Sequence, residues 1–278
     1  MRDSATKGLD PQQEAIIDWN IVETDRGPFP HVVKSPFIKP EIYEALKKDF
    51  PEGLPGGRSG FGLRPEQPEY GSFLASNSAW ASLVENIRSQ EFIDYVIKQF
   101  GDELVQQGCT LDLDKAKYVD FIETKENRKS SGLTKNDLFI RVDIQQAKMG
   151  YTKGIHTDKV RRFCSLTLSF CDKDTIGLVG GGLGLFTESS GTAEPVKTVE
   201  VRDNSAMIFP RWPNSFHAVM PIEKIGLSRN FLFIAISSTQ DIWEGNHEYS
   251  PEAKRIRKFR GLTARIKSLL KQIFGVGK

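Results

Sequence analysis

Cysteine and histidine are both scarce in this sequence. Its three cysteines, Cys109, Cys164 and Cys171, have no Cys-x-x-Cys spacing, and an odd number without a secretory signal argues against a disulfide framework. We interpret them as small buried hydrophobic residues in a protein of a reducing compartment. With only four histidines in 278 residues, any metal site that uses imidazole has few candidates.

Long apolar runs are also missing. The first twenty residues carry charges throughout and contain no continuous apolar stretch that fits a signal peptide or a membrane span. We therefore expect a cytoplasmic protein. The content of hydrophobic residues, 38%, is typical of a globular chain that can bury a core.

The spacing of apolar residues predicts helices first and strands afterwards. A helix is expected from near Pro40 to Pro51, because proline suits the first helical turn and ends a preceding helix. Helical spacing over residues 78 to 104 predicts one helix, or two joined near Ser89. Further along, the period changes to two, which indicates a β-sandwich or barrel, in the runs KYVDFIET, DLFIRVDIQQAK, FCSLTLSF, LGLFTE, TVEVRDNSAMIFP and RNFLFIAIS.

Two irregular segments interrupt this pattern. Residues 51 to 72 are dense in glycine and proline and are predicted to form a loop, and residues 124 to 137 form a charged connection between two strand-like runs. Long loops in a compact domain are more often functional than idle. We expect both segments to cover substrate at the mouth of the barrel.

One short motif has the strongest chemical signal. His156 and Asp158 are two residues apart in an extended segment, so their side chains point the same way and can converge on one ion. His217, directly before a strand-like run, is the best placed third ligand. Two histidines and one carboxylate form the facial set that binds iron(II) and leaves positions open for chemistry. Singly, each residue also fits a surface pair or a core histidine; together they favour a catalytic metal site.

An arginine at the start of the last apolar run needs a partner. Arg229 begins a run that is expected in the barrel wall, where a guanidinium without a counter-ion is costly. A carboxylate ligand that accepts two parallel hydrogen bonds is the natural partner, and Ser228 could add a third. Arg141, in an earlier run, is a second candidate to contact that ligand or the substrate, with a solvated strand position as an equal alternative.

These residues together resemble the iron(II) and 2-oxoglutarate-dependent oxygenase superfamily, in its prolyl-hydroxylase-like branch. The resemblance rests on His156-x-Asp158, on His217, on Arg229 after IEKIGLS, and on GGGLGLF between the ligands. It covers about residues 150 to 237.

The resemblance implies a mainly β fold with packed helices, built on a double-stranded β-helix core of jelly-roll or cupin-like form. We expect a single oxygenase domain over residues 1 to 250. Its N-terminal part, to about residue 108, would be helical, and its jelly-roll core would span about 109 to 240. Residues 251 to 278 would form a basic, amphipathic C-terminal helix.

The resemblance also implies cofactors and a reaction. Iron(II) would be held by His156, Asp158 and His217. The C5 carboxylate of 2-oxoglutarate would pair with Arg229, and Ser228 and Arg141 would be further contacts. O2 would be the oxidant. We expect hydroxylation of an unactivated C–H bond of a sugar, a lipid-linked glycan or a small metabolite, with release of succinate and CO2. An aspartate at position 158 favours hydroxylation over halogenation, whereas desaturation or ring closure stays open. The alternatives are a protein side-chain (prolyl-type) hydroxylase and a non-catalytic jelly-roll binding module.

Charge is unevenly distributed along the chain. Lys254 to Lys278 holds nine basic and no acidic residues, which leaves residues 1 to 253 with a net charge of −7 and argues against a large nucleic-acid groove. A helix with one apolar face and this many basic residues is predicted to bind an anionic membrane surface, on the inner face of the membrane. The alternative is that the helix docks on the domain itself or on a second copy of the protein. In plan, a membrane-bound form would resemble peripheral hydroxylases that modify inner sugars of bacterial lipopolysaccharide. The apolar residues fall on one side at roughly 100° per residue: Ile256, Phe259, Leu262, Ile266, Leu269, Leu270, Ile273 and Phe274.

Liposome flotation tests the predicted role of the tail. We expect the full chain to float with anionic vesicles and a form ending at Glu252 to remain in the dense fraction, because the truncation removes both the apolar face and the basic charges. Vesicles of neutral lipid control for the charge. Equal recovery of the two forms with anionic vesicles would mean that the tail does not bind membranes and instead packs on the protein or forms an oligomer interface.

Overall fold

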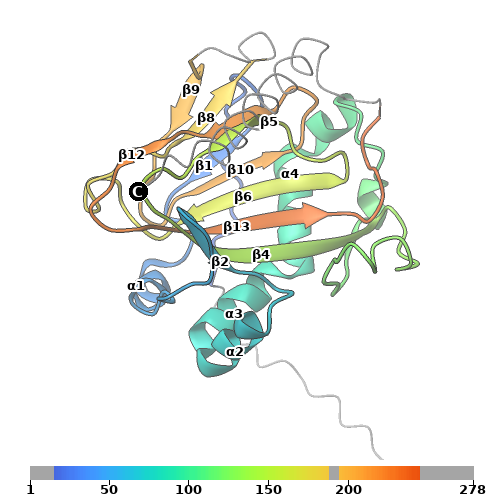
Figure 1. Cartoon of the computed structure of the whole chain (residues 1–278). Coiled ribbons are helices and arrows are strands. Elements are labelled where there is room, and N and C mark those ends of the chain that lie inside the picture. The colour runs from blue at the N-terminus through green and yellow to red at the C-terminus, as the bar shows by residue number, and fades with distance from the viewer. Residues whose placement is uncertain (1–15, 188–193, 245–278) are drawn as a thin grey trace, which may run out of the picture.

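Antiparallel strands from two sheets build the centre of the structure, a computed structural model that describes residues 16 to 187 and 194 to 244 (Figure 1). Along the chain they alternate between a larger and a smaller sheet. The larger sheet contains β4 (Asp137–Ala147), β6 (Arg162–Ser169), β10 (Ala206–Pro210) and β13 (Arg229–Ser237). The smaller sheet contains β5 (Lys153–His156), β8 (Leu183–Phe186), β9 (Lys197–Val199) and β11 (Phe216–Val219).

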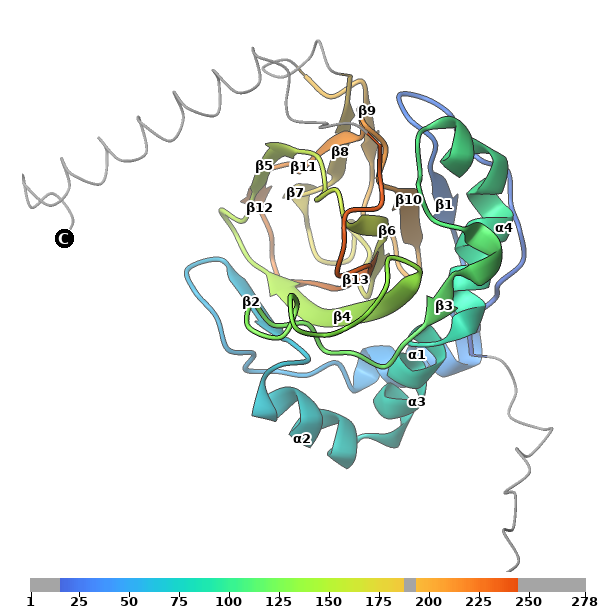
Figure 2. The same cartoon turned by 90° about the vertical axis from the view of Figure 1, so that its right-hand side faces the viewer.

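The strand order is that of a jelly roll. The larger sheet runs β10-β6-β13-β4 and the smaller one β5-β11-β8-β9, with antiparallel neighbours throughout. Strands that follow one another in sequence mostly lie in opposite sheets, so the chain winds as a double-stranded β-helix (Figure 2). The predicted fold class is therefore confirmed for the barrel and its packed helices, while the predicted C-terminal helix lies outside the described residues.

Shorter strands extend this core. On the larger sheet, β1 (Val32–Lys34) pairs with β10, and β2 (Gly60–Leu63) and β3 (Lys117–Tyr118) pair with β4. A separate ribbon joins β7 (Val179–Gly180) to β12 (Ile222–Lys224). At Gly180, with φ of 76°, an added Cβ would lie 2.0 Å from the carbonyl oxygen of Pro221, so this ribbon requires glycine there.

Helices pack on the outer face of the larger sheet (Figure 2). They are α1 (Pro40–Lys48), α2 (Pro68–Ser76), α3 (Ser78–Ile87) and α4 (Gln90–Gln106), followed by the 3₁₀ turn η1 (Leu113–Lys115). Apolar side chains of α3 and α4, including Trp80, Phe92 and Phe100, share one core with alternate residues of the strands beneath, such as Ile140 and Ile234. Within the described residues, no helix is long and apolar enough to span a membrane.

Most predicted elements are confirmed, and two regions are corrected. The run KYVDFIET, residues 117 to 124, forms a strand only at Lys117–Tyr118. The helix at Pro40 is present, and the pattern over residues 78 to 104 is two helices that meet at residues 88 and 89. Residues 51 to 72 are not a continuous loop, because they contain β2 and the start of α2. A glycine-rich edge strand resembles loop in sequence: an added Cβ at Gly62 would lie 2.8 Å from the carbonyl oxygen of Ile144 on β4, so close pairing requires the glycine.

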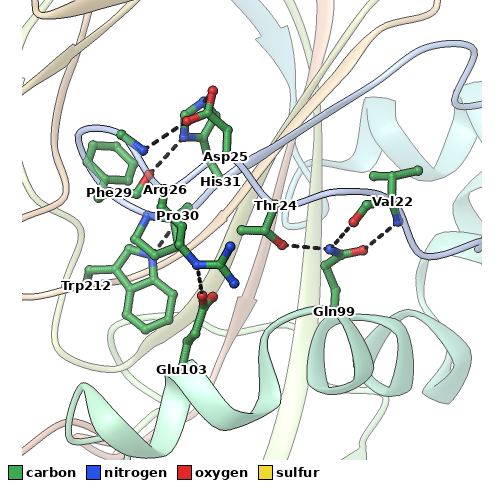
Figure 3. A network of polar contacts seen from close by, with 11 residues as sticks. Val22, Thr24, Asp25, Arg26, Phe29, Pro30, His31, Gln99, Glu103 and Trp212 are labelled. Carbon is green, nitrogen blue, oxygen red and sulfur yellow. Dashed lines mark hydrogen bonds and ion pairs between the residues drawn. The ribbon is translucent and has the colours of Figure 1, made fainter.

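The segment before β1 is fastened to α4 and to the end of β10 (Figure 3). Gln99 of α4 accepts a hydrogen bond from the Val22 N–H and donates to the Val22 carbonyl and to the Thr24 hydroxyl, at 3.2, 2.7 and 2.9 Å. At the other end of the segment, the indole N–H of Trp212 donates to the Pro30 carbonyl at 2.9 Å. The segment is thereby part of the folded wall.

His31 lies in this segment and is fully buried. Its Nδ1 is 2.8 Å from the Phe29 carbonyl oxygen, and its Nε2 is 3.2 Å from Nζ of Lys197 and 3.9 Å from Oδ2 of Asp25. Burial lowers the pKa of His31, and the Lys197 charge lowers it further, against the opposing effects of the Phe29 carbonyl and Asp25. The folded protein therefore holds this imidazole neutral, with Nε2 as an acceptor.

This neutral imidazole predicts acid sensitivity. The unfolded chain binds a proton on this side chain near the ordinary value of about 6.5, whereas folded His31 does so only at lower pH, so protonation favours the unfolded state. We expect the free energy of unfolding to fall as the pH decreases below about 6.5, and the His31→Gln variant to have a slope smaller by up to about 1.4 kcal/mol per pH unit. Urea unfolding across this pH range measures both slopes, with the exposed Asn214→Ala as control. Identical slopes would mean that His31 has the same pKa in the folded and unfolded states, which would contradict this prediction.

Candidate metal centre

Three side chains with metal-ligating atoms meet at one end of the barrel. His156 ends β5, Asp158 follows it, and His217 lies on β11 directly opposite His156 in the strand register. The two imidazole centroids are 4.3 Å apart, and one ligand atom from each of the three residues lies within 4.8 Å of the others. The residues predicted from spacing are thus brought together.

Each imidazole is oriented by a backbone carbonyl two residues earlier. Nδ1 of His156 is 2.9 Å from the Gly154 oxygen, and Nδ1 of His217 is 2.8 Å from the Ser215 oxygen. Because a carbonyl oxygen only accepts, Nδ1 is the protonated nitrogen in both rings and the lone pair is on Nε2. This is the tautomer that binds a metal through Nε2.

Asp158 is held as a carboxylate. Its Oδ2 accepts a hydrogen bond from the Ser165 hydroxyl at 2.7 Å, and its backbone carbonyl accepts from Nε of Arg211 at 3.4 Å. Burial alone would raise the pKa of Asp158, but the nearby His217 and Arg162 and the Ser165 hydrogen bond outweigh it and hold the pKa well below the usual range. The group is therefore charged and positioned.

The imidazoles are neutral at the pH of the cell. Burial lowers the pKa of His156 to about 3, and the neighbouring His217 and Lys153 add to this effect; burial likewise lowers the pKa of His217. Nε2 of His156 is buried and has no hydrogen-bond partner among the described residues. A buried nitrogen with a free lone pair, beside a second one and a carboxylate, fits a divalent metal ion.

A cavity of about 540 Å³ extends from His217 into the barrel. Its lining includes Tyr151, Thr167 and Gln145, and Arg229 lies in the same lining. Residues 55 to 57, 60 to 62, 64 and 67 also line it, so the segment predicted to cover substrate borders this cavity, whereas residues 124 to 137 contribute none of its lining.

Arg229 is a buried cation without a partner. Its side chain begins β13 opposite Ala147, is 3% exposed, and has its guanidinium carbon 4.8 Å from the ring centroid of Phe231. Nε and Nη1 have no hydrogen-bond partner among the described residues. Burial lowers the pKa of Arg229. An isolated buried charge is costly, so an anion that entered the cavity would stabilise this guanidinium.

The two other predicted cofactor contacts lie differently. Ser228 is half-buried and directly precedes Arg229, the first residue of β13. Arg141 faces the barrel interior from β4, but it forms ion pairs with Glu66 at 3.1 Å and Asp143 at 2.7 Å and is not part of the cavity lining. Its charge is therefore already matched by carboxylates of the protein.

Sequence reasoning missed several residues of the site. Ser165 and Thr167 of β6 line the cavity, and the only signal for them was the alternation of polar residues in FCSLTLSF. Tyr151 and Lys153 line it too, although nothing in their spacing distinguishes them from surface residues. These residues are recognised as part of the site only because the folded barrel places them in the lining of the cavity.

Comparison with known proteins gives likenesses of fold. No protein-family model and no curated protein matches the sequence. Solved structures that are similar include an oxidoreductase of the 2OG-Fe(II) oxygenase family from Burkholderia pseudomallei, with 12% identity over 79% of this chain and 88% of that one and a TM-score of 0.43. A prolyl 4-hydroxylase from Phytophthora capsici has 14% identity over 85% and 68%, with a TM-score of 0.44. A prolyl-4-hydroxylase from Pseudomonas putida has 16% identity over 75% and 92%, with a TM-score of 0.38.

Metal binding tests the site directly. We expect His156→Ala, Asp158→Ala and His217→Ala each to weaken Mn(II) binding by about a hundredfold or more, because three protein ligands are the minimum for this facial set, and Ser165→Ala to weaken it about tenfold by releasing the carboxylate. Calorimetric titration of each folded variant measures this, with Asp102→Ala on the exposed face of α4 as control. Wild-type affinity in the three ligand variants would place the metal elsewhere.

Proposed function

We propose that this protein is an iron(II)- and 2-oxoglutarate-dependent dioxygenase that hydroxylates an unactivated C–H bond. The observation that supports it best is the buried, unpartnered Arg229 in the same cavity as His217 of the His-Asp-His cluster. His217, one of the three clustered ligands, and the cation Arg229 thus line the same cavity. The reaction consumes 2-oxoglutarate, O2 and the substrate and yields succinate, CO2 and the hydroxylated product.

The donor set suits iron(II). His156, Asp158 and His217 would hold the ion through two neutral imidazoles and one carboxylate. When bound, the iron supplies the open coordination positions and the redox chemistry that activates O2. The same open side argues for catalysis over a purely structural metal, which proteins usually enclose with a full set of ligands.

The side chains around the site would position the co-substrate and the metal ligands and shield them from water. Arg229 would bind the C5 carboxylate of 2-oxoglutarate, and Phe231 beneath its guanidinium keeps that contact away from water. Leu183, Val219 and Phe233 give the cavity apolar walls, which strengthen the ionic contact. Ser165 holds Asp158, and the Gly154 and Ser215 carbonyls hold the imidazoles, so the ligands do not reorganise.

The substrate class stays a proposal. A sugar, a lipid-linked glycan or a small metabolite and a prolyl-type protein side chain are equally compatible with this cavity, and a binding module without catalysis would need neither the open metal side nor Arg229. Peripheral membrane association through Lys254 to Lys278 rests on the sequence alone, because the tail lies outside the described residues.

Arg229 provides the test of the co-substrate. We expect Arg229→Ala to weaken 2-oxoglutarate binding to the Mn(II)-loaded protein about ten- to a hundredfold, the loss of a charge-assisted pair worth roughly 1.5 to 3 kcal/mol, and Arg229→Lys to recover part of it. Mn(II) affinity should not change. Arg26→Ala, whose side chain is exposed, is the control. Unchanged 2-oxoglutarate affinity in Arg229→Ala would move this role to another cation such as Arg141, and absence of iron-dependent succinate formation by the unaltered protein would contradict the proposed function.

A further inference from the structure

Two more cations lie near the metal ligands in sequence and contact one aromatic ring. Lys153 begins β5, three residues before His156, and Arg162 begins β6, four residues after Asp158. Nζ of Lys153 and the guanidinium carbon of Arg162 each lie 5.5 Å from the ring centroid of Phe233. Phe233 and Lys153 both line the cavity. Lys153 thus lines the cavity that contains His217, and Arg162 lies against Phe233 in the wall of that cavity.

Neither cation has a counter-ion. Within residues 16 to 187 and 194 to 244, no carboxylate oxygen forms an ion pair with either side chain, and neither side chain makes a hydrogen bond. Nε and Nη1 of Arg162 are buried and unpartnered, and Lys153 is exposed at the rim. A buried guanidinium with unsatisfied donors is costly unless a ligand completes it.

The charges of the proposed reaction leave these two cations unmatched. Iron(II) and Asp158 together contribute one positive charge, Arg229 contributes another, and the two carboxylates of 2-oxoglutarate balance both. Asp143, the other carboxylate in the cavity lining, is paired with Arg141. Asp158 attracts both Lys153 and Arg162, but it serves as a ligand of the metal. The remaining positive charge of Lys153 and Arg162 calls for an anion from outside.

We propose that the substrate of this site has an anionic group, a carboxylate or a phosphate, which Arg162 and Lys153 bind beside the metal. The inference rests on the proposed function and adds the substrate class to it. The guanidinium fork matches two oxygens of either anion, and the lysine at the rim adds a point charge and attracts the anion into the cavity. Lys153 lies on β5 together with His156, and Arg162 follows Asp158 by four residues, so the anionic group would be bound close to the metal.

Matched pairs of small probes test the charge requirement. The full chain is loaded with Mn(II) and saturated with 2-oxoglutarate without oxygen, and then titrated calorimetrically with glycerol 3-phosphate against glycerol, and with N-acetylglycine against N-acetylglycinamide. We expect at least one anion of the two pairs to bind about tenfold or more tightly than its neutral partner. The pair that responds identifies the anion as phosphate or carboxylate.

Variants assign that preference to the two cations. Arg162→Gln and Lys153→Gln should each weaken the preferred anion about tenfold while Mn(II) and 2-oxoglutarate affinities stay within about twofold, since the metal ligands and Arg229 are intact. Lys148→Gln is the matched control for Lys153→Gln, because its Nζ also lies over a ring, 5.0 Å from the centroid of Phe61, but Lys148 does not line the cavity. Urea unfolding of each variant confirms that it folds.

Three results would overturn the anion site: no binding of either anion, equal binding of charged and neutral partners, or a preference that survives in both variants. Loss of 2-oxoglutarate binding in Arg162→Gln or Lys153→Gln would also overturn it, because the cations would then serve the co-substrate. Failure of the proposed function is seen separately, as absence of 2-oxoglutarate binding to the unaltered protein. In that case titration of the probes into the Mn(II)-loaded protein still decides whether the anion site exists.

Discussion

The register between β5 and β11 is the constraint on which the site depends. It sets His217 opposite His156, and a shift of one residue would turn one of the two imidazoles to the other face of the sheet. The register is fixed on the far side as well, since β11 also pairs along its whole length with β8. Asp158 lies outside the strands, two residues after His156. It is positioned there by the hydrogen bond that its carboxylate accepts from the Ser165 hydroxyl on the facing sheet.

The barrel can hold so many polar groups because its apolar stabilisation lies elsewhere. Along β4, Leu138, Ile140, Val142 and Ile144 point outward into the core shared with the helices, while Asp143 and Gln145 point inward. Burial of the outer face supplies the hydrophobic free energy, so the inner face is free to carry ligands and charges. The inner face also carries Arg229, whose Nε and Nη1 have no hydrogen-bond partner among the described residues.

The sequence alone was sufficient to predict site residues that are close together in the chain or that belong to a scarce residue type. The His-x-Asp spacing fixes a shared direction for two side chains, and with four histidines in the chain the third ligand had few alternatives. The sequence was not sufficient where the secondary structure or the role of a residue depends on contacts with residues far away in the chain. β2 is a strand because Gly60 and Gly62 allow close contact with Tyr151 and β4, although glycines alone predict a loop. Arg141 and Arg162 cannot be distinguished in sequence. In the fold, Arg141 pairs with two carboxylates, whereas Arg162 forms no ion pair with a carboxylate in the part of the chain that the structure describes.

The fastening of the segment before β1 has a consequence for how the protein is handled. The bond from Trp212 to Pro30 and the bond from Arg211 to the Asp158 backbone arise from neighbouring residues of the connection that leads to His217. Residues 22 to 31 thus brace the same short stretch that carries a metal ligand. A shortened form that begins after residue 31 would lack this outer support of the wall that carries His217, so we expect it to fold less stably than the full chain.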